Sequence, residues 1–454
     1  MKILIINVPI KSIIEQYDIP DYPAIALGYL YSYLKGKQVD VHVIDTKLEK
    51  LSFEAIINKV QNLKPDLIGI SSMTHEISLC GELCDQLKRV DTKIITVVGG
   101  VHISAVPEET LKSFASIDIG IIGEGEEIFH NVIKNINDLA KVGGIVFRTN
   151  GTIVLNQAAP EIKNLDLLPI PDWSAFPRSP RYHIITARGC PFHCSFCMTP
   201  YGNRVRERSP KNVLAELKTT IETFDPEYYR FNDETFGFNM KRANLILDYI
   251  IDNKLDKIPK SASMRANIVT EEVLKKMKRA GFEYIDYGVE SGNKEVLKRI
   301  HKNVTMEQTE KAVAMTKKAG IRVGANFILG HPYETMETAM ETINYAVKLN
   351  ADFNAIGIMC PYPGTEIYSL AMKGEGNYIL LSTDWKDYNK QIGNALELKN
   401  INRKQLEKLQ MIGYLKILVW NFRFLDLITF IWQNRYAGFA FFKKFFNLNH
   451  KTKA

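Results

Sequence analysis

Cysteine is scarce in this chain, and its scarcity excludes one large class of proteins. Six cysteines occur among 454 residues, and their uneven spacing does not suit a disulfide framework. We therefore expect a reducing, cytoplasmic compartment. Three of the six lie within eight residues, in Cys190-Pro-Phe-His-Cys194-Ser-Phe-Cys197, so this one cluster stands out.

Long apolar runs and a strong charge excess are also missing. The nearest candidate for a membrane span, residues 414–432, is interrupted by Lys416, Arg423 and Asp426. The formal charge of +7 is modest for this length and does not argue for nucleic acid as a partner. It permits an anionic substrate or contact with a membrane surface.

Two nucleotide-binding motifs are absent. G-x-G-x-x-G does not follow the first apolar strand, and G-x₄-G-K-[ST] does not occur. Their absence argues against a nicotinamide or ATP domain. With 46% hydrophobic residues over this length, the chain can form two or three domains of other kinds.

Residues 1–150 alternate short apolar strands with helical stretches. This pattern predicts a parallel, doubly wound sheet, because strands that helices cover on both faces are apolar throughout. The strands are expected near residues 2–8, 39–45, 66–72, 93–98 and 118–122.

Small and polar residues follow three of these strands, where doubly wound sheets bind their ligands. The candidate binding residues are Ser71, Ser72, Met73, Thr74, Gly99, Gly100, His102, Gly123, Glu124 and Gly125. The glycines have a second interpretation as tight strand–helix turns. His102 could equally be a turn histidine whose hydrogen bonds are satisfied within the protein.

Residues 151–180 break the alternation. They include Leu168-Pro-Ile-Pro-Asp-Trp173, which cannot be interior helix or central strand. We predict a linker here, with Trp173 docked against a domain.

Residues 181–370 resume the alternation with six β/α units. Strands are expected near 183–187, 227–232, 260–265, 283–289, 321–329 and 352–359. Six units are fewer than the eight of a closed barrel, so we predict an open, partial barrel with its active site at the carboxyl ends of the strands. Candidate site residues at those ends are Asp233, Glu234, Arg265, Glu290, Ser291 and Gly330. One such carboxylate alone would be interpreted as a solvated loop charge, but the whole set is hard to explain that way.

The cysteine cluster follows the first of these strands. Thiolates are soft ligands, and three at C-x₃-C-x₂-C spacing suit an iron–sulfur or zinc site. A closed structural site supplies four protein ligands, so three cysteines indicate an open coordination position. A zinc knuckle remains as an alternative if His193 is the fourth ligand.

Two family resemblances follow from these motifs. The runs Pro23-Ala-Ile-Ala-Leu-Gly-Tyr-Leu30, Gly99–Glu109 and Gly123-Glu-Gly-Glu126 resemble the cobalamin-binding domain that precedes many radical S-adenosylmethionine (SAM) enzymes. The D-x-H-x-x-G motif of many cobalamin domains is absent. The resemblance therefore implies cobalamin bound without a protein histidine, or a domain that has lost the cofactor.

The cysteine motif, with Phe196 before its last cysteine, resembles the radical SAM superfamily. This implies that Cys190, Cys194 and Cys197 ligate three irons of a [4Fe-4S] cluster, while SAM takes the fourth iron. It also implies contacts with SAM. Phe196 and Gly330 would contact the adenine, and Glu290 and Ser291 the ribose. Asp233 or Glu234 would bind the methionine amino group, and Arg265 the carboxylate.

The resemblance implies one-electron reduction of SAM, with flavodoxin or ferredoxin as the reducing partner, and radical chemistry on an unactivated carbon. Its commonest outcome is methyl transfer to the substrate. The alternative is oxidative cyclisation or another C–H rearrangement, as in the anaerobic cyclase of chlorophyll synthesis. A third interpretation is a non-enzymatic cobalamin or redox sensor. No single residue is assigned as catalytic.

Residues 371–454 form a helical, aromatic-rich tail, with helices expected at 414–432 and 436–446. The tail could cap the open side of the partial barrel and form an apolar wall, which would suit a hydrophobic substrate. It could also lie on a membrane surface, which would make the cytoplasmic protein membrane-associated. The predicted fold class is α/β: a doubly wound cobalamin-binding domain, a partial (β/α)₆ barrel, and a helical C-terminal segment.

Overall fold

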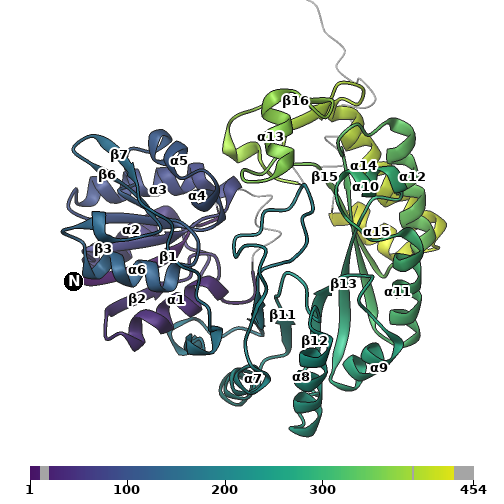
Figure 1. The fold of residues 1–454 in the computed structure, drawn as a ribbon, viewed down its shortest axis with the longest axis horizontal. Helices are drawn as coiled ribbons and strands as arrows, with labels where there is room; N and C mark the ends of the chain where they lie inside the picture. Colours follow the sequence, from purple (N-terminus) through teal and green to yellow (C-terminus); the bar gives the residue numbers. More distant parts are fainter. Residues whose placement is uncertain (11–19, 391–392, 434–454) are drawn as a thin grey trace, which may run out of the picture.

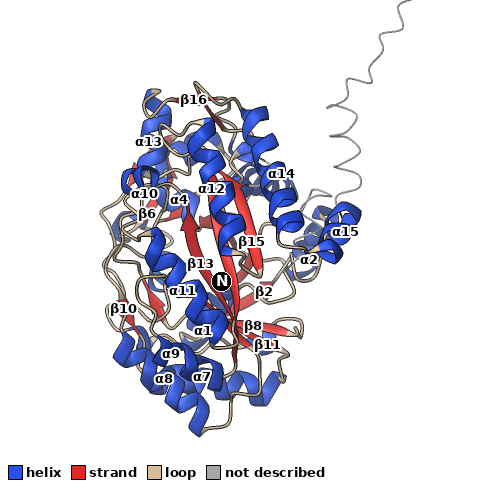
Figure 2. Ribbon diagram, turned by 90° about the vertical axis from the view of Figure 1, so that its right-hand side faces the viewer, coloured by secondary structure: helices blue, strands red, loops and turns tan. Residues whose placement is uncertain are grey.

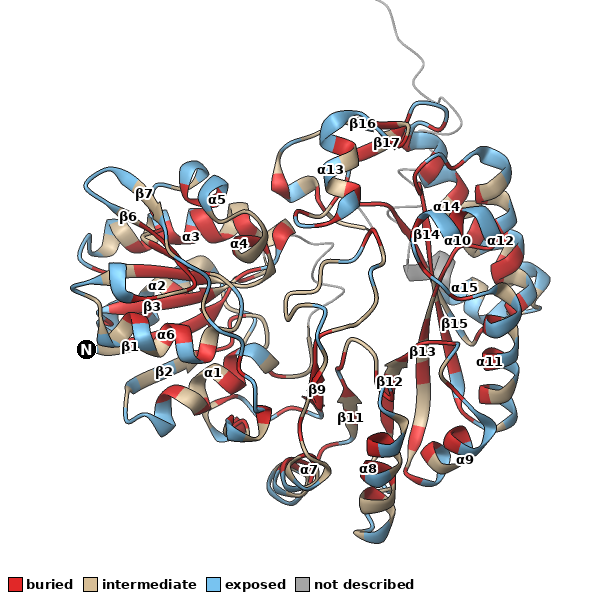
Figure 3. Cartoon of the chain, viewed as in Figure 1, coloured by how far each residue is buried: buried red, intermediate tan, exposed pale blue. Residues whose placement is uncertain are grey.

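The computed structural model describes residues 1–10, 20–390 and 393–433, and it contains two α/β bodies that face each other (Figure 1). The first body lies at the left of Figure 1 and the second at the right. Buried residues concentrate on the strands and on the inner faces of the helices, as Figure 3 shows.

A seven-stranded sheet forms the first body, in the order β2-β1-β3-β4-β5-β6-β7. Its strands are β1 (Lys2–Asn7), β2 (Asp40–Ile44), β3 (Leu67–Ser71), β4 (Ile95–Gly99), β5 (Ile119–Ile121), β6 (Ile145–Thr149) and β7 (Thr152–Leu155). The first five pair in parallel, as predicted. The antiparallel β6–β7 hairpin was not predicted, and it ends inside the segment interpreted as linker.

Helices cover both faces of this sheet. They are α1 (Ile25–Gly36), α2 (Phe53–Leu63), α3 (Ile77–Val90), α4 (Val101–Ala105), α5 (Pro107–Ser113) and α6 (Gly125–Lys134). Strand β1 shows why the apolar runs predicted a doubly wound sheet: Ile3, Leu4, Ile5 and Ile6 are all fully buried, so neither face of the strand meets water.

Trp173 fixes the linker against the first body. It lies in a short 3₁₀ turn, Trp173–Ala175, and is 1% exposed. A Cβ atom at Gly28 of α1 would lie 2.3 Å from the Trp173 ring, so only glycine lets the indole pack this closely. The predicted docking of Trp173 is therefore confirmed.

Six parallel strands form the second body, in the order β15-β14-β13-β12-β11-β8. They are β8 (Arg181–Ile184), β11 (Tyr228–Phe231), β12 (Lys260–Met264), β13 (Phe282–Glu290), β14 (Arg322–Leu329) and β15 (Phe353–Ile358). The predicted open, partial barrel is confirmed.

The helices of the barrel lie on the outside of the sheet (Figures 1 and 2). They are α7 (Pro210–Phe224), α8 (Met240–Asp252), α9 (Glu271–Arg279), α10 (Lys294–Arg299), α11 (Met306–Lys318) and α12 (Met336–Leu349). A polar side chain precedes each helix and accepts a hydrogen bond from an amide of its first turn, as Ser209 does for α7 and Thr270 for α9. These caps fix where each strand–helix connection ends.

A small antiparallel pair, β9 (Ala187–Arg188) and β10 (Arg206–Glu207), closes the base of the cysteine loop. The sequence did not predict it, because two-residue strands have no detectable periodicity.

The C-terminal segment contains α13 (Glu366–Lys373), β16 (Tyr378–Leu380), β17 (Leu396–Leu398), α14 (Arg403–Trp420) and α15 (Phe424–Gln433). Helix α14 packs against α12 and the edge strand β15, and the Ile356 amide donates to the Tyr414 hydroxyl at 3.0 Å. The helix predicted at 414–432 is broken at Phe422, whose φ is +56°. The helix predicted at 436–446 lies outside the described residues. No helix of the described part is long and apolar enough to cross a bilayer.

Candidate active site and cofactor cavity

The cysteine loop runs from β9 to β10 and is held at both ends by backbone contacts. Gly189 has φ +96°, and a Cβ atom there would lie 2.3 Å from the Arg204 carbonyl oxygen, so glycine is required at the turn into the loop. The Ser195 amide donates to the Ile300 carbonyl, and the Ser195 carbonyl accepts from the Ile367 amide. The loop is thus fastened to the end of α10 and the start of α13.

The three thiols of this loop lie close enough to influence one another's ionisation. Burial, with the neighbouring Cys194 thiol, raises the pKa of Cys190. Burial, with Cys194 and Cys190, raises the pKa of Cys197 to about 11. Three thiolates therefore need a cation to offset their charge, as metal ligation provides.

The three thiols lie on one loop, but they do not surround a common metal position. No three His, Cys, Asp or Glu side chains of the described chain stand at metal-binding distances. His193 is exposed and belongs to no such group among the described residues.

Arg265 tests whether these residues fit a cluster with an anionic ligand beside it. Its side chain is 6% exposed, and its Nη1 lies 3.9 Å from the Cys194 sulfur. Its Nε and Nη2 have no hydrogen-bond partner among the described residues, although both are buried. A buried guanidinium with unused donors is costly unless a ligand pairs with it, so the site fits thiolates and a carboxylate.

Asp233 and Glu234 differ sharply in their contacts. The Asp233 carboxylate accepts the amides of Thr186 and Ala187 and the Thr186 hydroxyl, at 2.5, 3.2 and 2.5 Å. It therefore fastens the end of β8. Glu234 has no such set of donors in the described structure; burial raises the pKa of its carboxyl, while the Gly189 amide lowers it. Of the two, Glu234 retains its capacity to bind a ligand.

Glu290 occupies a strained position at the end of β13. Its φ is +70°, which is uncommon for a residue other than glycine, and the strand pairing shifts register there. Its carboxylate accepts from Lys302 Nζ at 2.9 Å, and both side chains are buried. Ser291 beside it is fully buried and is bonded to Thr342 and to the Asn293 amide.

Gly330 and Phe196 meet around a buried histidine. Gly330 has φ +88°, and its amide donates to Glu334. The ring of His331 lies edge-on to Phe196, with centroids 6.2 Å apart, and burial lowers its pKa to about 4. His331 Nε2 lies 3.4 Å from the Glu290 carbonyl oxygen. The structure thus brings Phe196, Glu290 and Gly330 together through His331.

A cavity lies at the carboxyl ends of β3, β4 and β5. Six predicted residues line it, namely Ser71, Gly99, Gly100, Gly123, Glu124 and Gly125. Gly69, Val97 and Phe129 also line it, so the cavity extends between the sheet and α6. Gly100 has φ +114°, and a Cβ atom there would lie 2.3 Å from the Ser72 carbonyl oxygen. These glycines permit the close approach of a flat ligand, so the residues present fit a cofactor of that shape.

Four other predicted residues do not line this cavity: Ser72, Met73, Thr74 and His102. His102 is fully buried, and neither ring nitrogen has a hydrogen-bond partner among the described residues. It packs edge-on against Trp385 with centroids 4.8 Å apart, and burial lowers its pKa to about 4. It is therefore neither in the cavity nor a satisfied turn histidine.

The cavity has a second wall that the sequence did not predict. Arg188, Pro200 and Tyr201 of the second body line it opposite the strand ends. Pro200 and Tyr201 belong to the cysteine loop, three and four residues after Cys197. The two candidate cofactor sites therefore share a wall.

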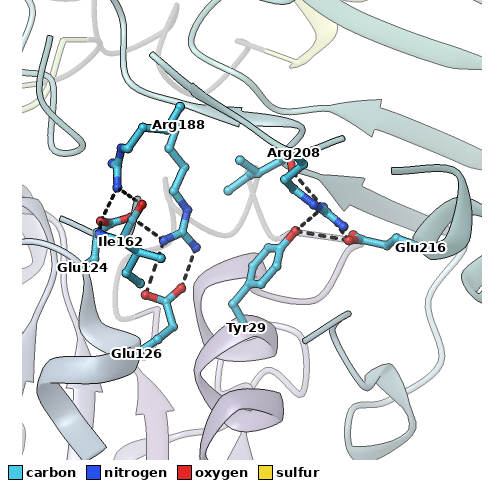
Figure 4. Close-up of polar contacts among 9 residues, drawn as sticks. Tyr29, Glu124, Glu126, Ile162, Arg188, Arg208 and Glu216 are labelled. Atoms are coloured by element: carbon cyan, nitrogen blue, oxygen red, sulfur yellow. Dashed lines mark hydrogen bonds and ion pairs between the residues drawn. The ribbon is translucent and has the colours of Figure 1, made fainter. Parts of the chain in front are cut away.

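Buried ion pairs hold the two bodies together beside this wall (Figure 4). Arg188 contacts Glu124 at 2.7 Å and Glu126 at 2.5 Å, and Arg206 contacts Glu124 at 2.5 Å. A second group joins Arg208 to Glu216 at 2.6 Å and to the Tyr29 hydroxyl at 2.8 Å. The sequence offers one indication of these ion pairs, the alternating arginines at 204, 206 and 208. It does not indicate their partners, which lie far away along the chain.

Comparison with known proteins agrees with both halves of this arrangement. The model of the radical SAM superfamily matches residues 184–346, and the model of the B12 binding domain matches residues 20–133. An uncharacterized methyltransferase, PH0819 of Pyrococcus horikoshii, is 32% identical over 91% of this chain and 92% of its own length. The anaerobic magnesium-protoporphyrin IX monomethyl ester cyclase of Rubrivivax gelatinosus is 29% identical over 77% of this chain and 66% of its own length.

Solved structures show the same fold at lower identity. The radical SAM methyltransferase TsrM from Kitasatospora setae has a TM-score of 0.70 at 19% identity, over 86% of this chain and 80% of that one. The cobalamin-dependent radical enzyme OxsB has a TM-score of 0.74 at 20% identity, over 90% and 65%. The chain belongs to the radical SAM superfamily, in the group with an N-terminal B12-binding domain, and is a cobalamin-dependent radical SAM enzyme with a [4Fe-4S] cluster, SAM and cobalamin as its cofactors.

Proposed function

We propose that this enzyme transfers a methyl group to an unactivated carbon of an organic substrate. One observation carries the proposal: residues of the cysteine loop form a wall of the cavity at the strand ends. When bound, the cluster and SAM supply a carbon-centred radical, and methylcobalamin supplies the methyl group. A shared wall brings both to one substrate.

The names of related proteins support methyl transfer. Besides PH0819, the bacteriochlorophyllide d C-8(2)-methyltransferase of Chlorobaculum tepidum is 24% identical over 80% of this chain and 78% of its own length. Similarity to the cyclase keeps oxidative cyclisation as the second candidate. A product assay distinguishes methyl transfer from cyclisation. S-adenosylhomocysteine accumulates when SAM regenerates the methyl donor, and it does not accumulate during cyclisation.

Named residues of the chain have distinct proposed roles. Cys190, Cys194 and Cys197 ligate the cluster, and Arg265 pairs with the SAM carboxylate, which its two unused buried nitrogens support. Glu234 binds the SAM amino group, because Asp233 is occupied by the end of β8. Glu290 contacts the ribose, and the Phe196 and Gly330 backbones contact the adenine. Ser291 is the weakest member of this set, because its hydroxyl is already bonded to Thr342.

Anaerobic reconstitution with iron, sulfide and cobalamin tests the proposal. After addition of SAM and dithionite, we expect 5′-deoxyadenosine and S-adenosylhomocysteine. Cys194→Ala should remove the cluster, whereas Cys80→Ala, a buried cysteine on α3, should leave it intact. Absence of both products from a fully loaded enzyme would refute the proposal.

Flavodoxin or ferredoxin is proposed as the physiological reductant. Such a protein must reach the cysteine loop, and the exposed His193 supports access from solvent there. Reduced flavodoxin or reduced ferredoxin, used in place of dithionite, should sustain SAM cleavage. If neither protein supports cleavage, both are excluded as the reductant.

Contact with a membrane surface is proposed for the C-terminal helices. Trp420, Phe422 and Leu425 are 63, 79 and 81% exposed, which is unusual for large apolar side chains. The enzyme should sediment with phosphatidylglycerol vesicles, and the Phe422→Ser, Leu425→Ser double variant should not. Equal sedimentation of both would rule out this contact.

A further inference from the structure

A second large cavity lies inside the partial barrel, at the end opposite the cysteine loop. Its volume is about 730 Å³, within the usual range of ligand sites. It is lined by Tyr22, Arg181, His183, Tyr228, Arg230, Asn232, Tyr284, Arg322 and Phe353. Arg181, Tyr228, Arg322 and Phe353 are the first residues of β8, β11, β14 and β15, so they form its outer rim.

The described side chains that line the cavity include cations but no anions. Among the described residues that line it there are three arginines and no carboxylate. Arg181 and Arg322 meet Asp21 and Glu283 at 3.1 and 4.0 Å, but both guanidinium side chains remain more than half exposed. Each therefore retains N–H donors for a ligand.

Arg230 lies deeper and is fixed in place. Its Nη2 contacts the Asp286 carboxylate and the Ser263 hydroxyl, each at 3.1 Å. The Tyr284 hydroxyl donates to the same Asp286 at 2.6 Å. A guanidinium has five N–H donors, so this anchoring leaves others directed elsewhere.

Apart from Asn232, the rest of the wall consists of flat rings. Tyr22 and His183 stack with centroids 3.8 Å apart, and Tyr284 meets Phe353 edge-on at 5.4 Å. Burial, with Arg230 and Arg181 nearby, lowers the pKa of His183 to about 3. The imidazole is therefore neutral and presents a ring face, not a further charge.

The cavity extends toward the cofactors. It is lined along β11 from Tyr228 to Asn232, which spans about 13 Å at the usual strand rise of about 3.3 Å per residue. Asn232 directly precedes Asp233 and Glu234, so the inner end lies at the SAM side of the barrel.

We propose that this cavity binds the anionic group of the substrate, so that the substrate is an organic carboxylate or phosphate with a flat, apolar body. The arginines bind the anion at the rim, the rings pack on the body, and the reacting carbon lies toward the cofactors. This assignment of the substrate rests on the proposed function.

Binding of fluorescent naphthyl probes to the reconstituted enzyme, without SAM, tests the proposal. The probes are 2-naphthoate, 2-naphthyl phosphate and the neutral 2-naphthamide, followed by fluorescence anisotropy. At least one anion should bind about tenfold more tightly than the amide, since a charge-assisted contact contributes about 1.4 kcal/mol. The stronger of the two anions identifies the carboxylate or the phosphate as the preferred group.

The Arg181→Gln, Arg322→Gln double variant should lose this preference. Both residues are largely exposed, so the variant should fold, as the melting temperature will verify. Arg279→Gln, an exposed arginine on the outside of α9, is the matched control and should bind like the parent. Equal affinity for all three probes, or an unchanged preference in the double variant, would overturn the proposal. Formation of 5′-deoxyadenosine is measured separately. If it forms while the probes bind equally, the anion site is wrong and the radical chemistry is not.

Discussion

Two adjacent carboxylates after β11 have different tasks. The Asp233 carboxylate is consumed by three donors at the end of β8, whereas Glu234 is left for a ligand. The sequence placed both at the site but could not rank them, because the ranking depends on donors 46 and 47 residues away.

Glu234→Gln is expected to weaken SAM binding about tenfold without changing the melting temperature, because the negative charge that pairs with the SAM amino group is lost. Titration calorimetry on the loaded enzyme measures the affinity. Asp233→Asn should instead destabilise the fold by about 2 kcal/mol, because hydrogen bonds to a buried charge are lost. The opposite pattern, with the Asn variant stable and unable to bind SAM, would reverse the assignment.

Glu334 should make stability depend on pH. Burial raises the pKa of its carboxyl from 4.5 to about 7, so the folded state holds a proton that the unfolded state releases. Its contribution is complete below about 4.5 and is lost as pH rises through about 7.

Urea unfolding at pH 5, 6, 7 and 8 measures this effect by difference. The parent should lose stability relative to Glu334→Gln as the pH rises, because glutamine keeps an acceptor oxygen but does not titrate. Parallel curves for the two proteins would show that Glu334 does not titrate in this range.

Among the secondary-structure elements, the long strands could be predicted from the sequence, whereas short strands and helix breaks could not. The β1 and β14 runs are apolar because helices cover them, and this burial is what the pattern records. The β9–β10 pair and the break at Phe422 leave no periodic signal. The predicted helix at 414–432 therefore joined two helices that the structure separates.

The buried ion pairs should be essential to the contact between the two bodies. Arg188→Leu leaves Glu126 buried without its guanidinium, which should destabilise the protein by about 3 kcal/mol. Lys141→Met removes an exposed pair with Asp138 and should leave the melting temperature nearly unchanged. Scanning calorimetry compares them, and equal melting temperatures would contradict the role given to Arg188.

Across the two bodies, mutation should affect the cavity at the ends of β3, β4 and β5 independently of the cysteine loop. Gly100→Ala forces a Cβ atom against the Ser72 carbonyl, at a φ that favours glycine, so cobalamin should be lost. Iron and sulfide should remain, because the cysteine loop is untouched.

Gly36→Ala, where a Cβ atom meets nothing within 4 Å, is the control and should keep both cofactors. Absorption spectra and iron analysis measure the two contents. Retention of cobalamin by the Gly100 variant would show that the strand-end turn does not approach the cofactor.

The arrangement of the two bodies was only partly predictable. The order of domains and the site at strand ends follow from alternation and from general rules of parallel sheets. The shared wall does not, because Pro200 and Tyr201 reach the cavity only through the docking of one body on the other.

The docked Trp173 has a consequence for how the two cofactors can serve one substrate. The docked turn ends at Phe176, so only residues 177–180 connect it to β8. Within this stretch the Ser179 hydroxyl donates to the Asp21 carbonyl. Four residues span at most about 14 Å even when fully extended. A swinging-arm cycle, in which one domain carries its cargo away and returns, has too short a tether here. If the enzyme transfers a methyl group as proposed, we therefore expect both cofactors to serve a stationary substrate, with movements no larger than those of a loop.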